Sequence, residues 1–286
     1  SLPDWFTQLL IEWRGVEGAA AVASACNRVP DLDLRVNRLR SSPAQVQQDL
    51  AAAGISSEPI VGCPDGLRIS GHSGDLRHWP GYAEGHWCVQ DCSAQWIAPL
   101  LDPQPGDRIL DACAAPGGKA THLAELVADQ AEIWAVDRSA GRLKRVAANA
   151  DRLGLASINA LATDAAKLLE QRPQWRESFH RILVDAPCSG LGTLARHPDA
   201  RWRVTPQSIR GLLPQQQVLL DGLLPLLAPQ GVLVYATCTI HPDENQKQIQ
   251  ELLKRHPSLC LHQESQLWPD QASGGDGFYS AVLQRA

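Results

Sequence analysis

Two cysteines in this chain stand where predicted strands end, and each lies near groups that could take part in chemistry. Cys188 follows Asp185 by three positions, and Pro187 restricts the backbone between them. Cys238 ends the apolar run 231–238. If the two strands are neighbours in a parallel sheet, both thiols and the Asp185 carboxylate lie on the same rim.

Two thiols and a carboxylate on one rim suit the modification of a pyrimidine base. A thiolate that bonds to carbon 6 of the ring makes carbon 5 nucleophilic, which splits one difficult step into two easier ones. An acid or an ammonium group beside the ring would stabilise the charge that develops there. The spacing alone leaves open whether Cys188 or Cys238 supplies the nucleophilic thiol.

A turn of small residues, Ala114–Gly118, joins a predicted strand over 107–113 to a predicted helix over Ala120–Val127. Such a turn lets a ligand approach the backbone, and the helix begins with unpaired N–H groups. A phosphate-binding P-loop is excluded, because Cys113 stands where that motif has Gly and Ala120 where it has Ser or Thr. The dinucleotide pattern G-x-G-x-x-G is also absent from the turn. We therefore expect a nucleoside-like cofactor here.

Two acids at later strand ends could hold such a cofactor. Asp137 ends the predicted strand Glu132–Asp137 and is placed to accept hydrogen bonds from ribose hydroxyls. Its alternative role is to cap the next helix, which Ser139 could serve equally well. Asp164 follows the next strand, where it could accept from an exocyclic adenine amine or cap the segment Ala165–Leu169.

Strand–helix alternation over 107–238 predicts a parallel sheet that is covered by helices on both faces. The predicted strands are Arg108–Cys113, Glu132–Asp137, Asn159–Thr163, Arg181–Ala186 and Gly231–Cys238. The predicted helices are Ala120–Val127, Gly141–Leu153, Ala165–Leu169 and Pro214–Leu227. The last apolar stretch, Phe278–Leu283, is expected to add an antiparallel strand at the edge.

Residues 1–82 lack this alternation and predict a separate small α+β domain, with 83–286 as the second domain. The predicted elements of the small domain are helices at Trp5–Trp13, Gly18–Cys26 and Ser42–Ala53 and strands at Asp33–Asn37 and Leu67–Ile69. A loop rich in Gly, His and Ser, Gly71–Gly85, marks the seam between the domains.

Composition limits the class of protein. The net charge of −5 argues against indiscriminate nucleic-acid binding, although the runs 138–152 and 196–210 are basic. The second run places Arg196 and Arg201 beside Trp202, a combination suited to phosphate contact and base stacking. The eight cysteines contain no C-x-x-C pair, so neither a zinc site nor a disulfide framework is expected. No apolar run is long enough to span a membrane and no signal peptide is visible, so we expect a cytoplasmic protein.

Four motifs together resemble those of the Sun/Fmu-type RNA cytosine-5 methyltransferases, which use S-adenosylmethionine. They are Cys113-Ala114-Ala115-Pro116-Gly117-Gly118-Lys119, Asp185-Ala186-Pro187-Cys188-Ser189-Gly190, Arg196-His197-Pro198-Asp199 with Trp202, and Tyr235-Ala236-Thr237-Cys238 with Pro242, Glu244 and Asn245. The resemblance is strongest to the RsmB-like bacterial enzymes that methylate 16S ribosomal RNA. It extends over nearly the whole chain, from Arg35-Val36-Asn37-Arg38 through 80–82 and 89–95 to Gly275-Asp276-Gly277-Phe278.

This resemblance implies a Rossmann-like class I methyltransferase fold with a mostly parallel seven-stranded sheet, and a small N-terminal α+β domain that binds RNA. It implies that Cys238 is the nucleophile, that Cys188 serves product release, and that Asp185 and Lys119 face the cytosine. We expect S-adenosylmethionine as the cofactor, no metal, 16S ribosomal RNA as the partner, and a monomer. The implied cofactor-binding residues are Cys113, Ala114, Ala115, Pro116, Gly117, Gly118, Lys119, Asp137, Asp164 and Asp185.

Three positions depart from the family pattern. Ala120 replaces a frequent Thr, Cys92 replaces a frequent Ala, and Ala195-Arg196 replaces a frequent Arg pair. The ribosomal subgroup also carries a helical NusB-like domain, of the antitermination-factor type, before the segment seen here. That domain either lies outside this sequence or is absent from the protein.

Three alternatives to a ribosomal RNA methyltransferase remain open. A cytosine-5 methyltransferase of the same family could act on transfer RNA instead. A methyltransferase that acts on an amine usually has Asp/Asn-Pro-Pro-aromatic where this chain has Asp185-Ala186-Pro187-Cys188. An RNA-binding scaffold with a vestigial cofactor fold would be expected to have lost a thiol or the small-residue turn, and this chain has both.

Overall fold

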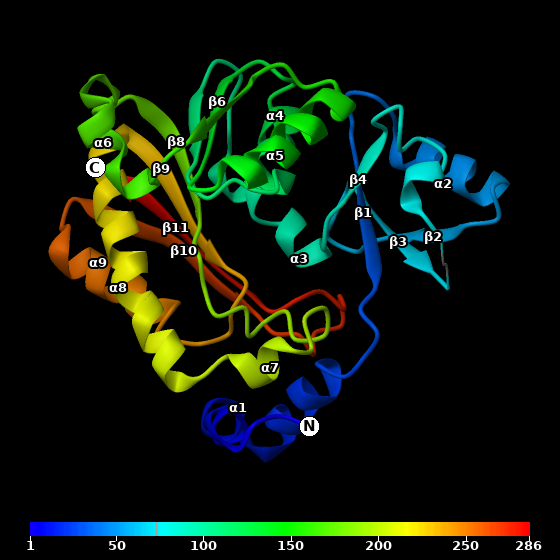
Figure 1. The fold of residues 1–286 in the computed structure, drawn as a ribbon, viewed down its shortest axis with the longest axis horizontal. Coiled ribbons are helices and arrows are strands. Elements are labelled where there is room, and N and C mark those ends of the chain that lie inside the picture. The colour runs from blue at the N-terminus through cyan, green and yellow to red at the C-terminus, as the bar shows by residue number, and fades with distance from the viewer. Residues whose placement is uncertain (72–73) are drawn as a thin grey trace.

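The larger sheet of the molecule has seven strands in the order β10-β11-β9-β8-β5-β6-β7 (Figure 1). The computed structural model describes residues 1–71 and 74–286. Strands β9, β8, β5, β6 and β7 run parallel, whereas β11 is antiparallel to both neighbours. The bounds are β5 Arg108–Asp111, β6 Glu132–Asp137, β7 Ile158–Ala162, β8 Phe179–Asp185, β9 Leu227–Thr237, β10 Leu259–Leu267 and β11 Phe278–Arg285. The expected Rossmann-like fold with a mostly parallel seven-stranded sheet is confirmed, and each predicted strand overlaps an observed one.

The outermost strand of this sheet escaped prediction. The expectation that Phe278–Leu283 lies at the edge is wrong, because β10 pairs with the outer side of β11. Residues 260–264 of β10 are exposed and include His, Gln and Glu, so the strand lacks the apolar pattern that revealed the others.

Two predicted helices also differ from the observed ones. The helix expected to begin at Pro214 is α8 (Pro206–Leu223), which begins earlier because Thr205 and Ser208 form a capping box. Pro214 therefore lies inside the helix rather than at its first turn. The segment predicted as the helix Ala165–Leu169 is a 3-10 turn, η3 (Ala165–Lys167), followed by the short helix α6 (Leu168–Gln171).

Helices cover both faces of the large sheet (Figure 1). On one face α4 (Gly118–Leu126) and α5 (Ala140–Leu153) pack around Leu183 of β8. On the other face α8 and α9 (Gln246–Arg255) pack around Ile182 and Val184 of the same strand. Among residues 1–71 and 74–286, no helix combines the length and apolarity that a membrane crossing requires. The shorter helical elements are α3 Cys92–Gln95, α7 Ala200–Arg203, η1 Leu76–His78, η2 Ala98–Leu101, η4 Pro173–Trp175 and η5 Leu224–Leu226.

A second, antiparallel sheet has the strand order β2-β3-β1-β4. Its core contains Leu34, Leu67 and Trp87 of the sheet and Val46 and Leu50 of the helix beside it. The helix and the two predicted strands are confirmed, whereas β2 and β4 were not predicted. The bounds are β1 Leu32–Val36, α2 Pro43–Ala52, β2 Ser56–Pro59, β3 Gly66–Ser70 and β4 Trp87–Val89.

The division of the chain at residue 82 stays a prediction. The predicted seam Gly71–Gly85 includes residues 72–73, which lie outside the described residues. Strand β4 follows residue 82 in sequence and completes the small sheet by pairing with β1.

The N-terminal helix α1 (Asp4–Ala25) packs away from the small sheet. Gly15 has a φ of 70° and interrupts the helix, so the two predicted helices on either side of it are confirmed. Phe6, Leu10 and Val22 of α1 share a core with residues from the far end of the chain, Leu191, Leu194, Ile209 and Ile240. Residues 1–26 therefore support the loop that follows Cys188.

A buried polar network joins the small sheet to α4. Arg35 on β1 is fully buried and forms an ion pair of 2.8 Å with Glu125 of α4. The same guanidinium donates to the Gln90 side chain, to Thr121 Oγ1 at 3.0 Å and to the Gly118 carbonyl oxygen at 2.7 Å. Because Gly118 is the first residue of α4, this network fixes the end of the small-residue turn relative to the small sheet.

Candidate active site

A cavity of about 280 Å³ lies at the carboxyl ends of the parallel strands, where the strand order reverses between β5 and β8. The residues that line it end or follow the five parallel strands or come from the helices α5 and α8. They are Ala112, Cys113, Ala115, Asp137, Arg138, Arg142, Thr163, Asp164, Ala165, Asp185, Ala186, Pro187, Cys188, Gln215, Gln216, Leu219 and Cys238. The topology thus collects strand-end groups that are far apart in sequence.

The two thiols singled out in the sequence lie side by side in this cavity. Strands β8 and β9 are parallel neighbours with Asp185 opposite Ala236, so the segments that follow them leave the sheet together. The Sγ atoms of Cys188 and Cys238 are 3.5 Å apart and are not joined in a disulfide. The hydrogen bond with Cys238, followed by burial, raises the pKa of the Cys188 thiol well above its usual value. Cys188 is therefore a protonated partner beside Cys238 at neutral pH.

Lys119 and Asp185 form the charged pair of the site. Lys119 Nζ donates to Asp185 Oδ2 at 2.6 Å and lies 5.1 Å from the centre of the Phe278 ring. Burial alone would lower the pKa of Lys119, but the negative charges of Asp185 and Asp111 and the hydrogen bond outweigh it and raise that pKa. Lys119 is therefore an ammonium group, held at the edge of the cavity by a carboxylate that lines it.

Asp111 is a buried carboxyl beneath this pair. It ends β5 and is fully buried, and neither side-chain oxygen has a hydrogen-bond partner among the described residues. Burial, and next the charge of Asp185, raise the pKa of Asp111 to about 7, while Lys119 opposes the shift. Asp111 falls within the strand predicted over Arg108–Cys113, and the sequence assigned it no role because its burial depends on the packing of the sheet.

Only some residues of the small-residue turn line the cavity. Cys113 and Ala115 line it, whereas Ala114, Pro116, Gly117, Gly118 and Lys119 do not. Gly117 has a φ of 109°, and a Cβ there would lie 3.1 Å from the Cα of Val146 on α5. Arg142 of α5 also donates to the Ala115 carbonyl oxygen at 2.6 Å. Glycine therefore lets the turn lie directly on α5, which holds it in place.

Asp137 and Asp164 both line the cavity, but the backbone uses them differently. Ser139 caps α5 by accepting from the Arg142 N–H at 3.2 Å, which leaves Asp137 free of that role. Asp137 accepts from the Ser139 N–H at 2.9 Å. Asp164 caps η3 through the Ala166 N–H at 3.1 Å and also pairs with Arg138 at 3.0 Å. Both of the roles left open for Asp164 are compatible with this position, because its side chain also faces the cavity.

The interpretation of Arg196 and Arg201 as phosphate ligands is wrong in this structure, because protein groups already occupy both guanidinium groups. Arg201 is buried and donates to Asn27 Oδ1 at 2.8 Å and to the Cys26 carbonyl oxygen at 2.8 Å. Trp202, by contrast, is 61% exposed. Local sequence could not distinguish these neighbours, since the distinction depends on the distant segments that pack against α7.

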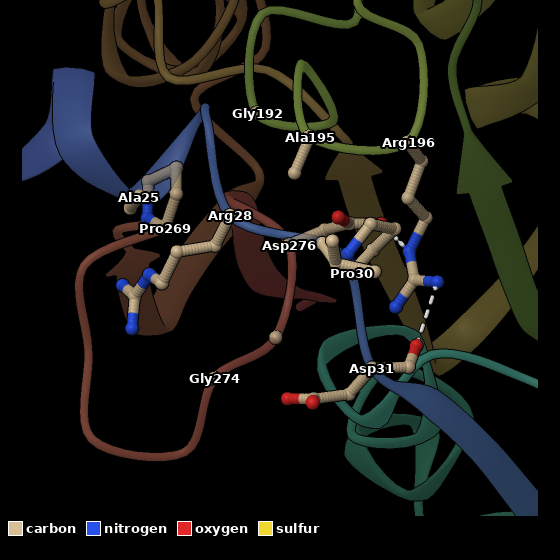
Figure 2. A pocket seen from close by; sticks show the side chains of 12 residues that line it. Ala25, Arg28, Pro30, Asp31, Gly192, Ala195, Arg196, Pro269, Gly274 and Asp276 are labelled. Atoms are coloured by element: carbon tan, nitrogen blue, oxygen red, sulfur yellow. Dashed lines mark hydrogen bonds and ion pairs between the residues drawn. The ribbon is translucent and has the colours of Figure 1, made fainter. Parts of the chain in front are cut away.

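Arg196 lines a second cavity of about 150 Å³ between residues 25–31, 192–196 and 269–276 (Figure 2). Its guanidinium contacts Asp91 at 2.6 Å, Asp276 at 3.0 Å and the Asp31 carbonyl oxygen at 3.0 Å. Burial, and next the charge of Asp91, raise the pKa of Asp276 to about 7. This cluster ties the loop after Cys188 to the entrance of β1.

The residues around this cluster include one arrangement with the spacing of a metal site. Within the described part of the chain, ligand atoms of Asp33, Asp91 and Cys92 lie within 4.8 Å of one another. Asp33, however, accepts two hydrogen bonds from Arg68, and Asp91 is paired with Arg196. Both carboxylate charges are already balanced by guanidinium groups, so we assign no metal to these residues.

Comparison with known proteins adds a family to this geometry. Residues 98–284 match the family model described as 16S rRNA methyltransferase RsmB/F. Residues 2–74 match a model described as the ferredoxin-like domain of RsmF/B-like methyltransferases.

Individual proteins with similar sequences and structures agree with these matches. The chain is 46% identical to a probable ribosomal RNA small subunit methyltransferase B from Synechocystis sp., over 90% of this chain and 57% of that protein. It is 39% identical to ribosomal RNA small subunit methyltransferase B from Yersinia pseudotuberculosis, over 92% of this chain and 62% of that protein. The chain thus spans less than two thirds of either relative. A methyltransferase homolog from Pyrococcus horikoshii superposes with a TM-score of 0.87 at 26% identity, over 99% of this chain and 95% of that one.

Proposed function

The chain belongs to the RsmB/F family of 16S rRNA methyltransferases, and from this premise we propose that it methylates carbon 5 of a cytosine in 16S ribosomal RNA. The methyl donor in this proposal is S-adenosylmethionine. The observation that carries the proposal is the pair of thiols 3.5 Å apart, beside the Lys119–Asp185 ion pair, on one cavity. We also propose a cytoplasmic localisation, because a protein that acts on ribosomal RNA works where ribosomes are.

The two thiols have separate roles in this proposal. The Cys238 thiolate bonds to carbon 6 of the cytosine, and the electrons of the ring double bond move toward N3. The addition breaks the aromaticity of the ring and makes carbon 5 nucleophilic, while the Lys119–Asp185 pair stabilises the charge at N3. The electrons return from N3 as carbon 5 bonds to the methyl group, and the electron pair of the broken bond would stay on the sulfur that carried the methyl group. A base then takes the carbon 5 proton, the carbon 6–sulfur bond breaks and Cys238 regains its electrons. Cys188, a protonated thiol in contact with Cys238, assists this release.

The cavity residues fit S-adenosylmethionine. When bound, this cofactor supplies a methyl group on a positively charged sulfur. The Asp137 carboxylate would accept hydrogen bonds from the ribose hydroxyls, and Asp164 would accept one from the adenine amine. Cys113 and Ala115 would lie against the nucleoside, with Ala114, Pro116, Gly117 and Gly118 shaping the turn behind them. The strand-end carboxylates are acceptors, which matches a ligand rich in hydroxyl and amine donors.

The RNA would reach this cavity across the exposed part of the segment after Cys188. Trp202 is 61% exposed and can stack on a base, and Arg203 beside it is 71% exposed along its side chain. The small sheet is attached to the same segment through Arg196. We therefore assign RNA contact to α7 and the small sheet together.

The decisive experiment combines two cysteine variants with 16S ribosomal RNA transcripts and S-adenosylmethionine. Cys238→Ala should abolish methyl transfer and leave cofactor binding by calorimetry unchanged. Cys188→Ala should accumulate a covalent enzyme–RNA adduct that survives a denaturing gel. Full methyl transfer by Cys238→Ala would overturn the proposal, and transfer RNA methylated in preference to ribosomal RNA would correct its substrate.

A further inference from the structure

The side chains of the residues that follow the two active-site cysteines are in contact with each other. Ser189 follows Cys188 and Thr239 follows Cys238, and their hydroxyl oxygens are 2.8 Å apart. The register of β8 with β9 ends at Asp185 and Ala236, and beyond it the backbone contacts are sparser: the Ala186 N–H donates to the Ala236 carbonyl oxygen at 2.9 Å and the Gly192 N–H to the Cys238 carbonyl oxygen at 3.0 Å. A side-chain contact beside the cysteines would add to these backbone bonds in keeping the thiols 3.5 Å apart.

Glu244 supplies that contact. Its side chain is 0% exposed, although a carboxylate is costly to bury without partners. Oε1 accepts from the Ser189 N–H at 2.8 Å and from Gln216 Nε2 at 3.1 Å. Oε2 accepts from Ser189 Oγ at 2.5 Å and from Thr239 Oγ1 at 3.3 Å. One carboxylate thus holds both cysteine loops and helix α8.

Glu244 lies behind the cavity wall. Glu244 is not among the residues that line the cavity, whereas its partner Gln216 is. The Tyr235 hydroxyl donates to the Glu244 carbonyl oxygen at 2.7 Å, which fixes the backbone as well as the side chain. Burial raises the pKa of Glu244, and the hydrogen bonds from Ser189, Gln216 and Thr239 oppose that shift.

We propose that Glu244 is a positioning residue that sets the separation of the Cys188 and Cys238 thiols by holding both loops. This inference rests on the proposed function for its consequence, since a fixed separation keeps the release thiol beside the adduct. A carboxylate suits this role better than an amide, because every group that faces its oxygens is a donor. In Glu244→Gln the side-chain amide nitrogen is itself a donor, so it would face one of these donor groups and leave both without an acceptor.

The first test measures the thiol separation without RNA. Diamide removes two electrons and two protons from a pair of thiols and joins them in a disulfide, and peptide mass spectrometry identifies the Cys188–Cys238 linkage. We expect Glu244→Gln to slow formation of this linkage about tenfold, because a misplacement of about 1 Å is enough to slow a proximity-dependent reaction. An unchanged rate would overturn the proposal. This measurement stands even if the chain methylates a different RNA.

The second test separates positioning from a general loss of stability. Glu244→Gln should lower kcat for methyl transfer about 10- to 100-fold, leave KM for S-adenosylmethionine unchanged, and raise the fraction of enzyme trapped as adduct. Glu125→Gln removes a carboxylate that is also buried, but in the network with Arg35, so it should lower the melting temperature without raising the trapped fraction. Equal trapped fractions in the two variants would contradict a positioning role.

A third set of variants covers the case in which Glu244→Gln does not fold. Ser189→Ala and Thr239→Val each remove one hydroxyl from the same carboxylate and leave its other partners in place. Each should slow the Cys188–Cys238 linkage by a smaller factor than Glu244→Gln. Glu264→Gln, which changes a carboxylate bonded to Tyr279 on the outer strands, should not slow it. A normal linkage rate in both hydroxyl variants would overturn the inference.

Discussion

Buried charges occupy two regions of this molecule, and the two regions treat them differently. In the polar network between the small sheet and α4, here called the Arg35 network, the guanidinium of Arg35 is bonded to the Glu125 carboxylate and to three further acceptors. At the carboxyl ends of β5 and β8, Asp111 has no hydrogen-bond partner among the described residues, and Lys119 has Asp185 alone. Satisfied charges hold the architecture together, whereas unsatisfied charges beside a cavity are available for chemistry.

Glu244 lies next to the cysteines, but its charge is fully hydrogen-bonded like the charges of the Arg35 network. It is fully buried and both of its oxygens are satisfied by protein donors. Closeness to the site is therefore a weaker indicator of chemistry than an unmatched charge. We expect the following four variants to separate the two regions.

Asp185→Asn should have the largest effect, because it removes the negative charge that holds Lys119 at the cavity. We expect kcat for methyl transfer to fall about 10²–10³-fold, the usual range for loss of a group that stabilises a developing charge. The measurement is the initial rate with saturating RNA and S-adenosylmethionine. Asp270→Asn, which breaks the ion pair with Arg14 instead, is the control and should keep its rate. A rate for Asp185→Asn within threefold of the wild type would remove this pair from the mechanism.

Arg35→Met tests the Arg35 network and should lower the stability of the folded protein. The free energy of unfolding should fall by about 3–5 kcal/mol, because Glu125 is left as an unpaired buried charge. Urea denaturation measures this loss, and the double variant with Glu125→Met should recover much of it. If the single and double variants are equally unstable, packing around the small sheet matters more than its charge.

Asp111→Asn tests the unsatisfied carboxyl by its dependence on pH. The pKa of Asp111 is about 7 in the folded protein against the ordinary Asp value of 3.8, so the folded state binds this proton more tightly. Its stabilising contribution is full below pH 4 and is lost as the pH rises through 7, on the order of 4 kcal/mol in total. Wild type minus variant should therefore show this slope in unfolding free energy between pH 4 and 8. Parallel curves would show that Lys119 keeps Asp111 ionised throughout, against burial and the charge of Asp185.

Trp202→Ala should have the smallest effect, confined to RNA affinity. The side chain is mostly exposed, so its removal should weaken binding by about 1–3 kcal/mol, the range for one stacked base. A filter-binding titration at fixed salt measures the change. Trp96→Ala, at another partly exposed tryptophan, is the matched control. Equal losses in the two variants would place the RNA elsewhere.

Most of the fold could be predicted because its signals are local. Apolar runs and the helices between them revealed the five parallel strands, and the two helices predicted at Trp5–Trp13 and Gly18–Cys26 lie on either side of the break in α1 at Gly15. Strand β10 was missed because it is exposed over 260–264, and the start of α8 was missed because Pro214 was taken as a first-turn residue. A local pattern fails where an element lacks an apolar face, as in β10, or where a residue such as Pro214 can stand either in the first turn of a helix or inside it.

The sequence by itself determined the chemistry available to this protein. It supplied Cys188, Cys238, Asp185 and Lys119, and the parallel pattern that sends strand ends to one rim. Only the tertiary structure decided which charges are matched: Arg196 and Arg201 are occupied by protein groups, Asp111 is left without a partner, and Glu244 joins the two loops. The physical reason is that desolvation and hydrogen bonding depend on segments far apart in the chain, which no local pattern of residues specifies.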